Sequence, residues 1–259
     1  MINLRDEEKK FVYKKCVGII KKDDEDYYFK ESYEGGVELV ASELANLVNI
    51  NCINYEIVKI KNRYYYFSKA LPKEKFCTFE KLHIPVKNLY SIWNELEVSF
   101  PQYKDKLMHQ LIKIYLFDIL LLNPDRNEGN IGLYYDKDDI NLIILDNERS
   151  FYGVGKSNIS SKFDKKDKLK DGHMFIAPGI PSIANFLNEL EYFIKTSSDE
   201  YIEMLNNLLD ILTPEVVMNT FELVESKNNI ELPMKDEYIR RYEINYYYVK
   251  ELLSISRTR

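Results

Sequence analysis

The densest run of polar side chains that could do chemistry follows an apolar stretch ending at Leu122. The run reads Asn123-Pro124-Asp125-Arg126-Asn127-Glu128-Gly129-Asn130, and two short apolar segments later another carboxylate stands at Asp146. If those segments pair as a hairpin, Asp125, Asn130 and Asp146 lie within reach of one another. Phosphoryl transfer from MgATP needs such a set, because one carboxylate orients the attacking hydroxyl while an amide oxygen and a second carboxylate bind the metal.

The spacing of these three residues matches the arrangement in protein kinases. There, an Asp is followed by an Asn five residues later and by a second Asp after a short hairpin. Asp125 and Asn130 have that spacing, and Asp146 stands at the expected place. Taken one at a time, Asp125 and Asn130 are explained as turn residues and Asp146 as a strand-end cap. The combination of apolar helix, loop, hairpin and final Asp is more specific, and it favours a kinase-like site.

A kinase-like site also needs a lysine for the α- and β-phosphates and a glutamate that pairs with it. Residues 27–30 read as a short strand ending in Lys30, and a helix follows with Glu38 near its start and Glu43 further on. Lys30 could reach the phosphates with Glu38 as its partner, although Glu43 competes for that role. The alternative is a surface lysine, with Glu38 favouring the helix N-terminus through the helix dipole.

Three segments resemble motifs of one group of atypical kinases. Residues 122–133 resemble the catalytic loop of HipA-like kinases, N-x-D-R-H-x-x-N followed by a short hairpin. Residues 144–151 are similar to the I-D-N-G-x-x-F segment that binds metal in type II phosphatidylinositol 4-kinases. Residues 38–45 are similar to the N-E-x-x-x-x-x-L-A helix of HipA-like kinases, which favours Glu38 over Glu43 as the partner of Lys30.

This resemblance implies an α+β, two-lobed, protein-kinase-like fold with a small β-rich N-lobe, a larger mainly helical C-lobe and ATP between them. It implies Asp125 as the catalytic base, Asn130 and Asp146 as Mg²⁺ ligands, and Lys30 on the phosphates. Members of the group phosphorylate Ser or Thr of proteins, or inositol lipids. The adenine is expected against the backbone of the segment Phe67, Ser68, Lys69, Ala70 and Leu71.

Some features depart from the family pattern and keep two alternatives open. Asn127 stands where the family often has His, Asn147-Glu148 replaces the Phe-Gly of ordinary kinases, and Gly18 is the only glycine of the first hairpin, which should cover the phosphates. These departures motivate a pseudokinase that binds nucleotide as an interaction module. The Ile-Asp-Asn segment motivates a lipid kinase, although the sequence has no strongly basic amphipathic helix or lipidation signal.

The elements that must position these residues follow from hydrophobic periodicity. Residues 1–70 read as an N-lobe with two hairpins and one helix, and residues 71–259 as a C-lobe. The hairpins are expected at residues 12–20 with 27–30 and at 55–60 with 64–68, around a helix at 37–48. In the C-lobe, a third hairpin is expected at 131–135 with 140–145, and helices at 86–98, 104–122, 182–195, 199–212, 215–225 and 235–254. Ser197 and Glu200 fit a capping box.

Composition excludes several other classes. The chain has 259 residues and nine glycines, none in a G-x-G-x-x-G dinucleotide fingerprint. The net charge of −6 lacks the footprint of a nucleic-acid binder. Three scattered cysteines, a charged start and the lack of a long apolar segment favour a cytoplasmic protein with no membrane partner. The expected partners are ATP, a protein substrate and, by resemblance to toxin kinases, an antitoxin-like protein. Residues 153–157 imitate the end of a P-loop, but Ser150 replaces its first glycine.

Overall fold

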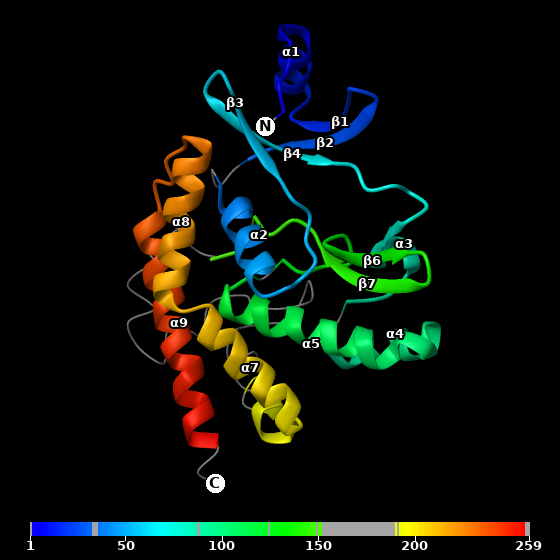
Figure 1. The fold of residues 1–259 in the computed structure, drawn as a ribbon, viewed down its shortest axis with the longest axis vertical. Coiled ribbons are helices and arrows are strands. Elements are labelled where there is room, and N and C mark those ends of the chain that lie inside the picture. Colours follow the sequence, from blue (N-terminus) through cyan, green and yellow to red (C-terminus); the bar gives the residue numbers. More distant parts are fainter. Residues whose placement is uncertain are drawn as a thin grey trace.

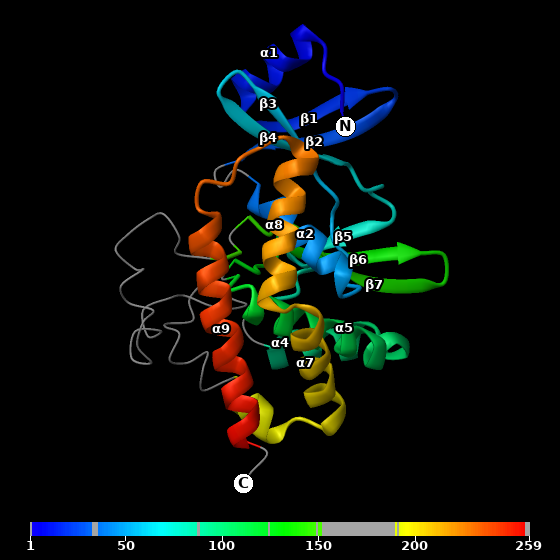
Figure 2. The same ribbon diagram turned by 60° about the vertical axis from the view of Figure 1, so that its left-hand side comes forward.

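The computed structural model describes residues 2–32, 36–86, 89–123, 125–148, 150–151, 190 and 192–256. Within these ranges the chain forms two antiparallel sheets and a set of helices (Figure 1). A four-stranded sheet lies at one end of the molecule, and a three-stranded sheet lies between it and the helical end (Figures 1 and 2). The expected α+β class, with a small β-rich part and a larger, mainly helical part, is confirmed.

The four-stranded sheet contains both hairpins predicted for the N-terminal part. Its strands β1 (Val17–Lys22), β2 (Glu25–Glu31), β4 (Arg63–Lys69) and β3 (Glu56–Ile60) lie in that order, all antiparallel. Alternate residues face opposite sides of a sheet. On the outer side Phe29, Tyr65 and Phe67 are buried in a small apolar core. The other side carries Lys30 and faces the three-stranded sheet.

Residues 12–15 belong to a helix rather than to the first strand, so the first 70 residues hold two helices where one was predicted. Helix α1 (Asp6–Lys15) has acidic residues in its first turn and two lysines in its last, a distribution that the helix dipole favours. It ends at Cys16, whose φ is 63°. Val12 of α1 is fully buried in the small core, so the helix covers the outer face of the sheet.

Helix α2 (Val37–Leu47) follows the prediction closely but packs away from the small core. Its apolar side chains are buried in the large core that α5 (Lys104–Leu120) also enters. Eight of its eleven residues are buried, which explains why its apolar positions extend beyond a single stripe. The helix therefore links the strand that carries Lys30 to the helical part of the molecule.

The three-stranded sheet holds the third predicted hairpin and one strand that the sequence analysis missed. Strands β6 (Ile131–Asp136) and β7 (Asp139–Ile144) pair with each other as the predicted hairpin. The third strand, β5 (Phe76–Thr78), pairs with β6 and is too short to show an alternating pattern. A Cβ on Gly132 would lie 2.5 Å from the carbonyl oxygen of Cys77, so this glycine allows β5 to approach β6.

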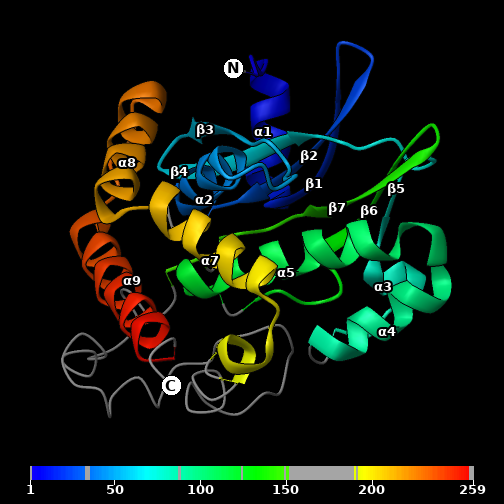
Figure 3. The same ribbon diagram turned by 60° about the horizontal axis from the view of Figure 1, so that its bottom comes forward.

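Of the remaining helices, α4, α7 and α9 contact α5, which crosses the helical part next to the second sheet (Figure 3). Their predicted positions hold within a few residues, and α7 begins after Ser198 as N-cap, without the capping box expected from Ser197. Of the helix expected at residues 182–195, all but residues 190 and 192–195 lie outside the described ranges. None of the described helices is both long and apolar enough to cross a membrane. The further elements are α3 (Phe79–Leu82), α4 (Leu89–Ser99), η1 (Pro101–Tyr103), α7 (Asp199–Ile211), α8 (Pro214–Asn228) and α9 (Lys235–Ser256).

The close approach of β5 gives a stability prediction. Gly132→Ala should lower the free energy of unfolding by about 1–3 kcal/mol, because the new methyl group meets backbone that cannot rotate away. Gly129→Ala is the control, since a Cβ there meets only the ends of the Asn127 and Glu80 side chains. Urea unfolding of both variants measures the difference, and equal stability would contradict the packing argument.

Candidate active site

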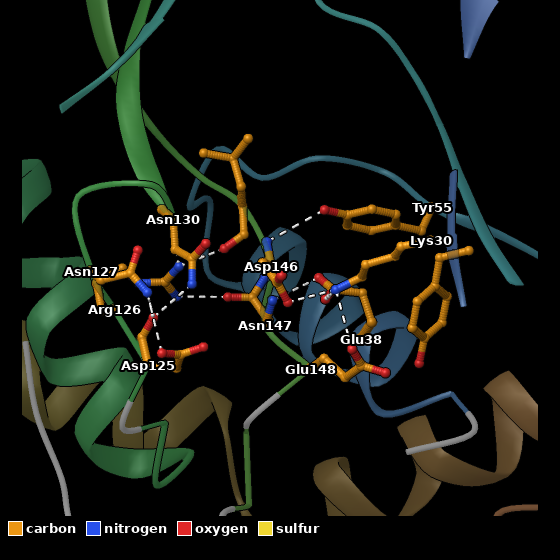
Figure 4. A network of polar contacts seen from close by, with 12 residues as sticks. Lys30, Glu38, Tyr55, Asp125, Arg126, Asn127, Asn130, Asp146, Asn147 and Glu148 are labelled. Atoms are coloured by element: carbon orange, nitrogen blue, oxygen red, sulfur yellow. Dashed lines mark hydrogen bonds and ion pairs between the residues drawn. The ribbon is translucent and has the colours of Figure 1, made fainter. Parts of the chain in front are cut away.

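The centre of the candidate site is the ammonium group of Lys30. The residue lies on β2 opposite Val17 of β1 and Tyr66 of β4. Its Nζ lies 2.6 Å from Asp146 Oδ1 and 3.3 Å from Glu148 Oε2 (Figure 4). A third carboxylate, Glu38 Oε2, lies at 3.5 Å. Three carboxylates therefore surround one cation, on a side chain that is only 12% exposed.

Glu38, and not Glu43, is the partner of Lys30 on α2. Glu38 is fully buried, and its Oε1 accepts a hydrogen bond of 2.8 Å from the backbone N–H of Asn147. Glu43 instead pairs with Lys227 of α8, at 3.0 Å. The two glutamates are five residues apart, so they point in different directions from the helix.

Among the described residues around Lys30, three carboxylates face one ammonium group. Burial alone would lower the pKa of Lys30, but the three carboxylates outweigh it and the net shift is upward, so the ammonium form persists. Burial raises the pKa of Glu38, although Lys30 opposes this shift. The neighbouring carboxylates cause the shift of the Lys30 pKa, whereas burial of the carboxyl group causes that of Glu38. The same carboxylates concentrate hard oxygen ligands around one ammonium group.

The candidate catalytic loop, of which residues 123 and 125–130 are described, is held in shape by its own amides. Asn123 Oδ1 accepts from the N–H of Asp125, and Asn127 Nδ2 donates to Asp125 Oδ1 at 3.2 Å. Asn130 Nδ2 donates to the carbonyl oxygen of Asp125 at 2.7 Å, and this leaves its Oδ1 as the atom available to a metal. Asn127 thus positions the carboxylate of Asp125 from the place where the family often has His.

Arg126 joins the catalytic loop to the segment that carries Asp146. The guanidinium group is buried and forms a two-pronged ion pair with Asp118 of α5, at 2.8 and 2.9 Å. It also donates to the carbonyl oxygens of Asn130 and Leu145, at 2.8 Å each, and to Asn147 Oδ1 at 2.6 Å. Figure 4 shows this side chain between the catalytic loop and Asn147. One side chain therefore sets the spacing of both segments.

Sequence reasoning gave no role to Asp118, Arg126, Asn147, Glu148 or Tyr55. Tyr55 accepts at its hydroxyl from the N–H of Asp146, at 3.3 Å. One signal was available for the first pair: Asp118 interrupts a strongly apolar helix, and a buried carboxylate requires a cationic partner. Asn147 and Glu148, which replace the Phe-Gly of ordinary kinases, both belong to the site: Asn147 accepts a hydrogen bond from Arg126, and Glu148 forms an ion pair with Lys30.

The residues expected to contact adenine face different sides of β4 and the chain after it. Ser68 pairs with Tyr28 and therefore shares the face of Lys30, whereas the Phe67 side chain lies in the outer core. Lys69 forms an ion pair with Glu25, and the N–H of Ala70 donates to Asp26, at 2.8 Å. Leu71 lines a cavity of about 520 Å³ next to the residues that follow α2.

The sheet face that carries Lys30 also exposes apolar side chains. Val17 and Ile19 of β1 are 54% and 56% exposed, and Tyr28 of β2 is 39% exposed. Cross-strand partners point to the same side of a sheet, so Ile19 and Tyr28 lie beside each other one step from Lys30. An apolar surface next to a cation is what a flat base with attached phosphates would contact.

Gly18, the single glycine of the first hairpin, lies within strand β1 and not in the turn. Gly18 pairs with Phe29, and a Cβ there would lie 3.2 Å from the Phe29 ring, on the face opposite Lys30. The turn of the hairpin, at Asp23 and Asp24, lies at the far end from Lys30. Packing against Phe29 therefore explains this glycine. The P-loop imitation at residues 153–157 lies outside the described ranges, and Ser150 is buried.

Comparison with known proteins identifies the fold. No family model and no curated protein matches the chain. The Helicobacter pylori proinflammatory kinase CtkA matches it with a TM-score of 0.65 and 14% identity, over 93% of this chain and 94% of CtkA. The chain has the fold of the HipA-like kinases. HipA of Shewanella oneidensis MR-1, in a structure with HipB and operator DNA, matches with a TM-score of 0.54 and 11% identity. The match covers 88% of this chain and 60% of the HipA chain.

The buried Arg126–Asp118 pair gives a second stability prediction. Asp118→Leu should lower the free energy of unfolding by about 3–5 kcal/mol, because it leaves a buried guanidinium without its counter-charge. The double variant Asp118→Leu/Arg126→Met should lose clearly less than the sum of the two single variants. Lys106→Met is the control: its ion pair with Asp139 is exposed to solvent, so its loss should hardly change the free energy of unfolding. Additive losses in chemical denaturation would contradict this coupling.

Proposed function

We propose that the protein is an ATP- and Mg²⁺-dependent kinase of the HipA-like type that transfers the γ-phosphoryl group to Ser or Thr of a protein. The observation that carries the proposal is the convergence of Lys30 and Glu38 with Asp146, which lies 116 residues after Lys30 in the sequence, as ion pairs of 2.6 and 3.5 Å with the lysine. The fold shared with CtkA, a kinase by name, supports it. An antitoxin-like partner and a cytoplasmic location remain part of this proposal.

Each residue of the site has a role in that reaction. The ammonium group of Lys30 would neutralise the α- and β-phosphates, and Glu38 would keep it directed toward them. Asp125 would orient the acceptor hydroxyl and accept its proton, while Asn127 holds its carboxylate in place. Arg126 would keep the catalytic loop and the Asp146 segment at a fixed separation during the transfer.

The donor atoms near Asp146 suit magnesium. Mg²⁺ prefers hard oxygen ligands and usually binds through one or two carboxylates together with substrate phosphates. Asn130 Oδ1 and the Asp146 carboxylate, which is 38% exposed, supply such oxygens, and the carboxylates of Glu38 and Glu148 lie next to Asp146 around Lys30. Bound Mg²⁺ would supply charge neutralisation at the transferred phosphoryl group.

The surface beside the catalytic loop favours a protein acceptor over an inositol lipid. A cavity of about 390 Å³ opens there, lined by Asn127 and Gly129 of the loop together with Glu80, Glu128 and His83. Its described lining holds two glutamates and neither lysine nor arginine. Such a surface would repel a phosphoinositide headgroup and attract a basic segment of a protein.

The assignment of Asp125 is tested by phosphoryl transfer from [γ-³²P]ATP. Asp125→Asn should lower kcat by about 10²–10⁴-fold, because the amide cannot accept the proton, while unfolding stability changes little. Asp138→Asn, a similar change in the exposed turn between β6 and β7, should keep wild-type activity. Equal transfer by wild type and Asp125→Asn would refute the role. Binding of MgATP without any transfer by the wild type would favour the pseudokinase alternative.

The acidic cavity gives a prediction about the acceptor. With Ser-containing peptides rich in Lys and Arg, Glu80→Gln/Glu128→Gln should raise KM for the peptide by about tenfold, since it removes two charges from the rim. KM for ATP should not change. Glu128 accepts a hydrogen bond from the N–H of Val86, and the amide oxygen of the substituted side chain can still accept it. Transfer to phosphatidylinositol vesicles rather than to peptides would establish the lipid alternative instead.

A further inference from the structure

Helix α2 contacts the candidate site on one side and helix α8 on another. Glu38 points into the site. Gly36 and Glu43 are seven residues apart, which is about two helical turns, so they lie on one common face of the helix. The rotation of about 100° per residue places that face roughly opposite Glu38. Helix α8 lies beside this part of α2 in both side views (Figures 1 and 2).

The contacts on this face come from α8 and from the turn that leads to α9. At the start of α2, a Cβ on Gly36 would lie 2.8 Å from Ile230 Cδ1 and 2.9 Å from Leu232 Cδ2, so the turn presses directly against the backbone. Gly36 also has a φ of 134°, which side-chain-bearing residues rarely adopt. Two turns along, Lys227 Nζ lies 3.0 Å from Glu43 Oε1.

One carboxylate bonds both to the turn and to the first residue of α9. Glu225 Oε1 accepts from the N–H of Leu232, and Glu225 Oε2 accepts from Lys235 Nζ, at 2.8 Å each. The carbonyl oxygen of Glu225 accepts from the N–H of Ile230 at 3.2 Å. Leu232 is 3% exposed, so its side chain is fixed between the turn and α2. A rigid turn can transmit a fixed position to the helix that it contacts.

We propose that the α8–α9 turn, residues 229–234, is a brace that sets the position of α2 and thereby holds Glu38 against Lys30. Leu232 and Ile230 are then positioning residues for the site, and the pair Lys227–Glu43 is a second, weaker point of attachment. The effect of this brace on catalysis rests on the proposed function, whereas its effect on the position of α2 does not. The C-terminal helices would thus keep the lysine–glutamate pair assembled without a partner protein.

The structural test is amide hydrogen exchange. The N–H of Gly36 donates to Tyr66 Oη and the N–H of Asn147 donates to Glu38 Oε1, so both amides report on the position of α2. Leu232→Ala should speed their exchange about tenfold relative to core amides of α5 in the same sample. Leu253→Ala is the matched control, because it is an equally buried leucine near the other end of α9.

Further variants keep the test decisive if Leu232→Ala folds poorly. Ile230→Ala removes the other contact from a partly buried position, and it should have the same local effect. Leu232→Met conserves volume and should keep wild-type exchange. If Leu232→Ala and Ile230→Ala speed the exchange of these two amides no more than Leu253→Ala does, the proposed brace is refuted.

The catalytic consequence is measured separately. In an active enzyme, Leu232→Ala should lower kcat several-fold with KM for the acceptor peptide unchanged, and Leu232→Met should restore it. An unchanged kcat together with accelerated exchange would overturn the positioning role. If the wild type transfers no phosphate, the proposed function fails, and the exchange data alone still decide whether the turn fixes α2.

Discussion

The ammonium group of Lys30 among three carboxylates is the interaction on which the site depends. Glu38, Asp146 and Glu148 come from a helix and from a segment far along the chain, and all three lie within 3.5 Å of one nitrogen. Burial makes this arrangement costly unless the charges are paired. Under the proposed function, the carboxylate oxygens would bind Mg²⁺, and the ammonium group of Lys30 would face the phosphates that accompany the metal.

A second buried pair fixes the parts that must meet around this centre. Arg126 reaches from the catalytic loop to Asp118 of α5, to two backbone carbonyls and to Asn147. Because α5 is packed in the large core, Arg126 anchors both the loop and the Asp146 segment to a buried helix. The site is therefore positioned from below by α5 and from the side by α2, which is itself in contact with α8.

Most of the elements around the site could be predicted from hydrophobic patterning, because both hairpins of the first sheet, α2 and the β6–β7 hairpin are long and periodic. The misses have physical reasons. Helix α1 carries too few apolar residues to stand out, since only one of its faces is buried, and β5 is too short to alternate. Gly18 is the single glycine of the first hairpin, and only the register of the sheet shows that it lies against Phe29 on the face opposite Lys30.

The sequence by itself determined the chemical inventory: an Asp and an Asn at kinase spacing, a second Asp after a hairpin, and a lysine on an early strand. Residue type and spacing suffice for that, because local geometry fixes what a loop or a hairpin can present. Only the tertiary structure decided that Glu38 rather than Glu43 meets Lys30, that Glu148 joins them, and that Arg126 is held by Asp118. These pairings join residues that are far apart in the chain or on different elements, so the packing of helices and sheets selects them.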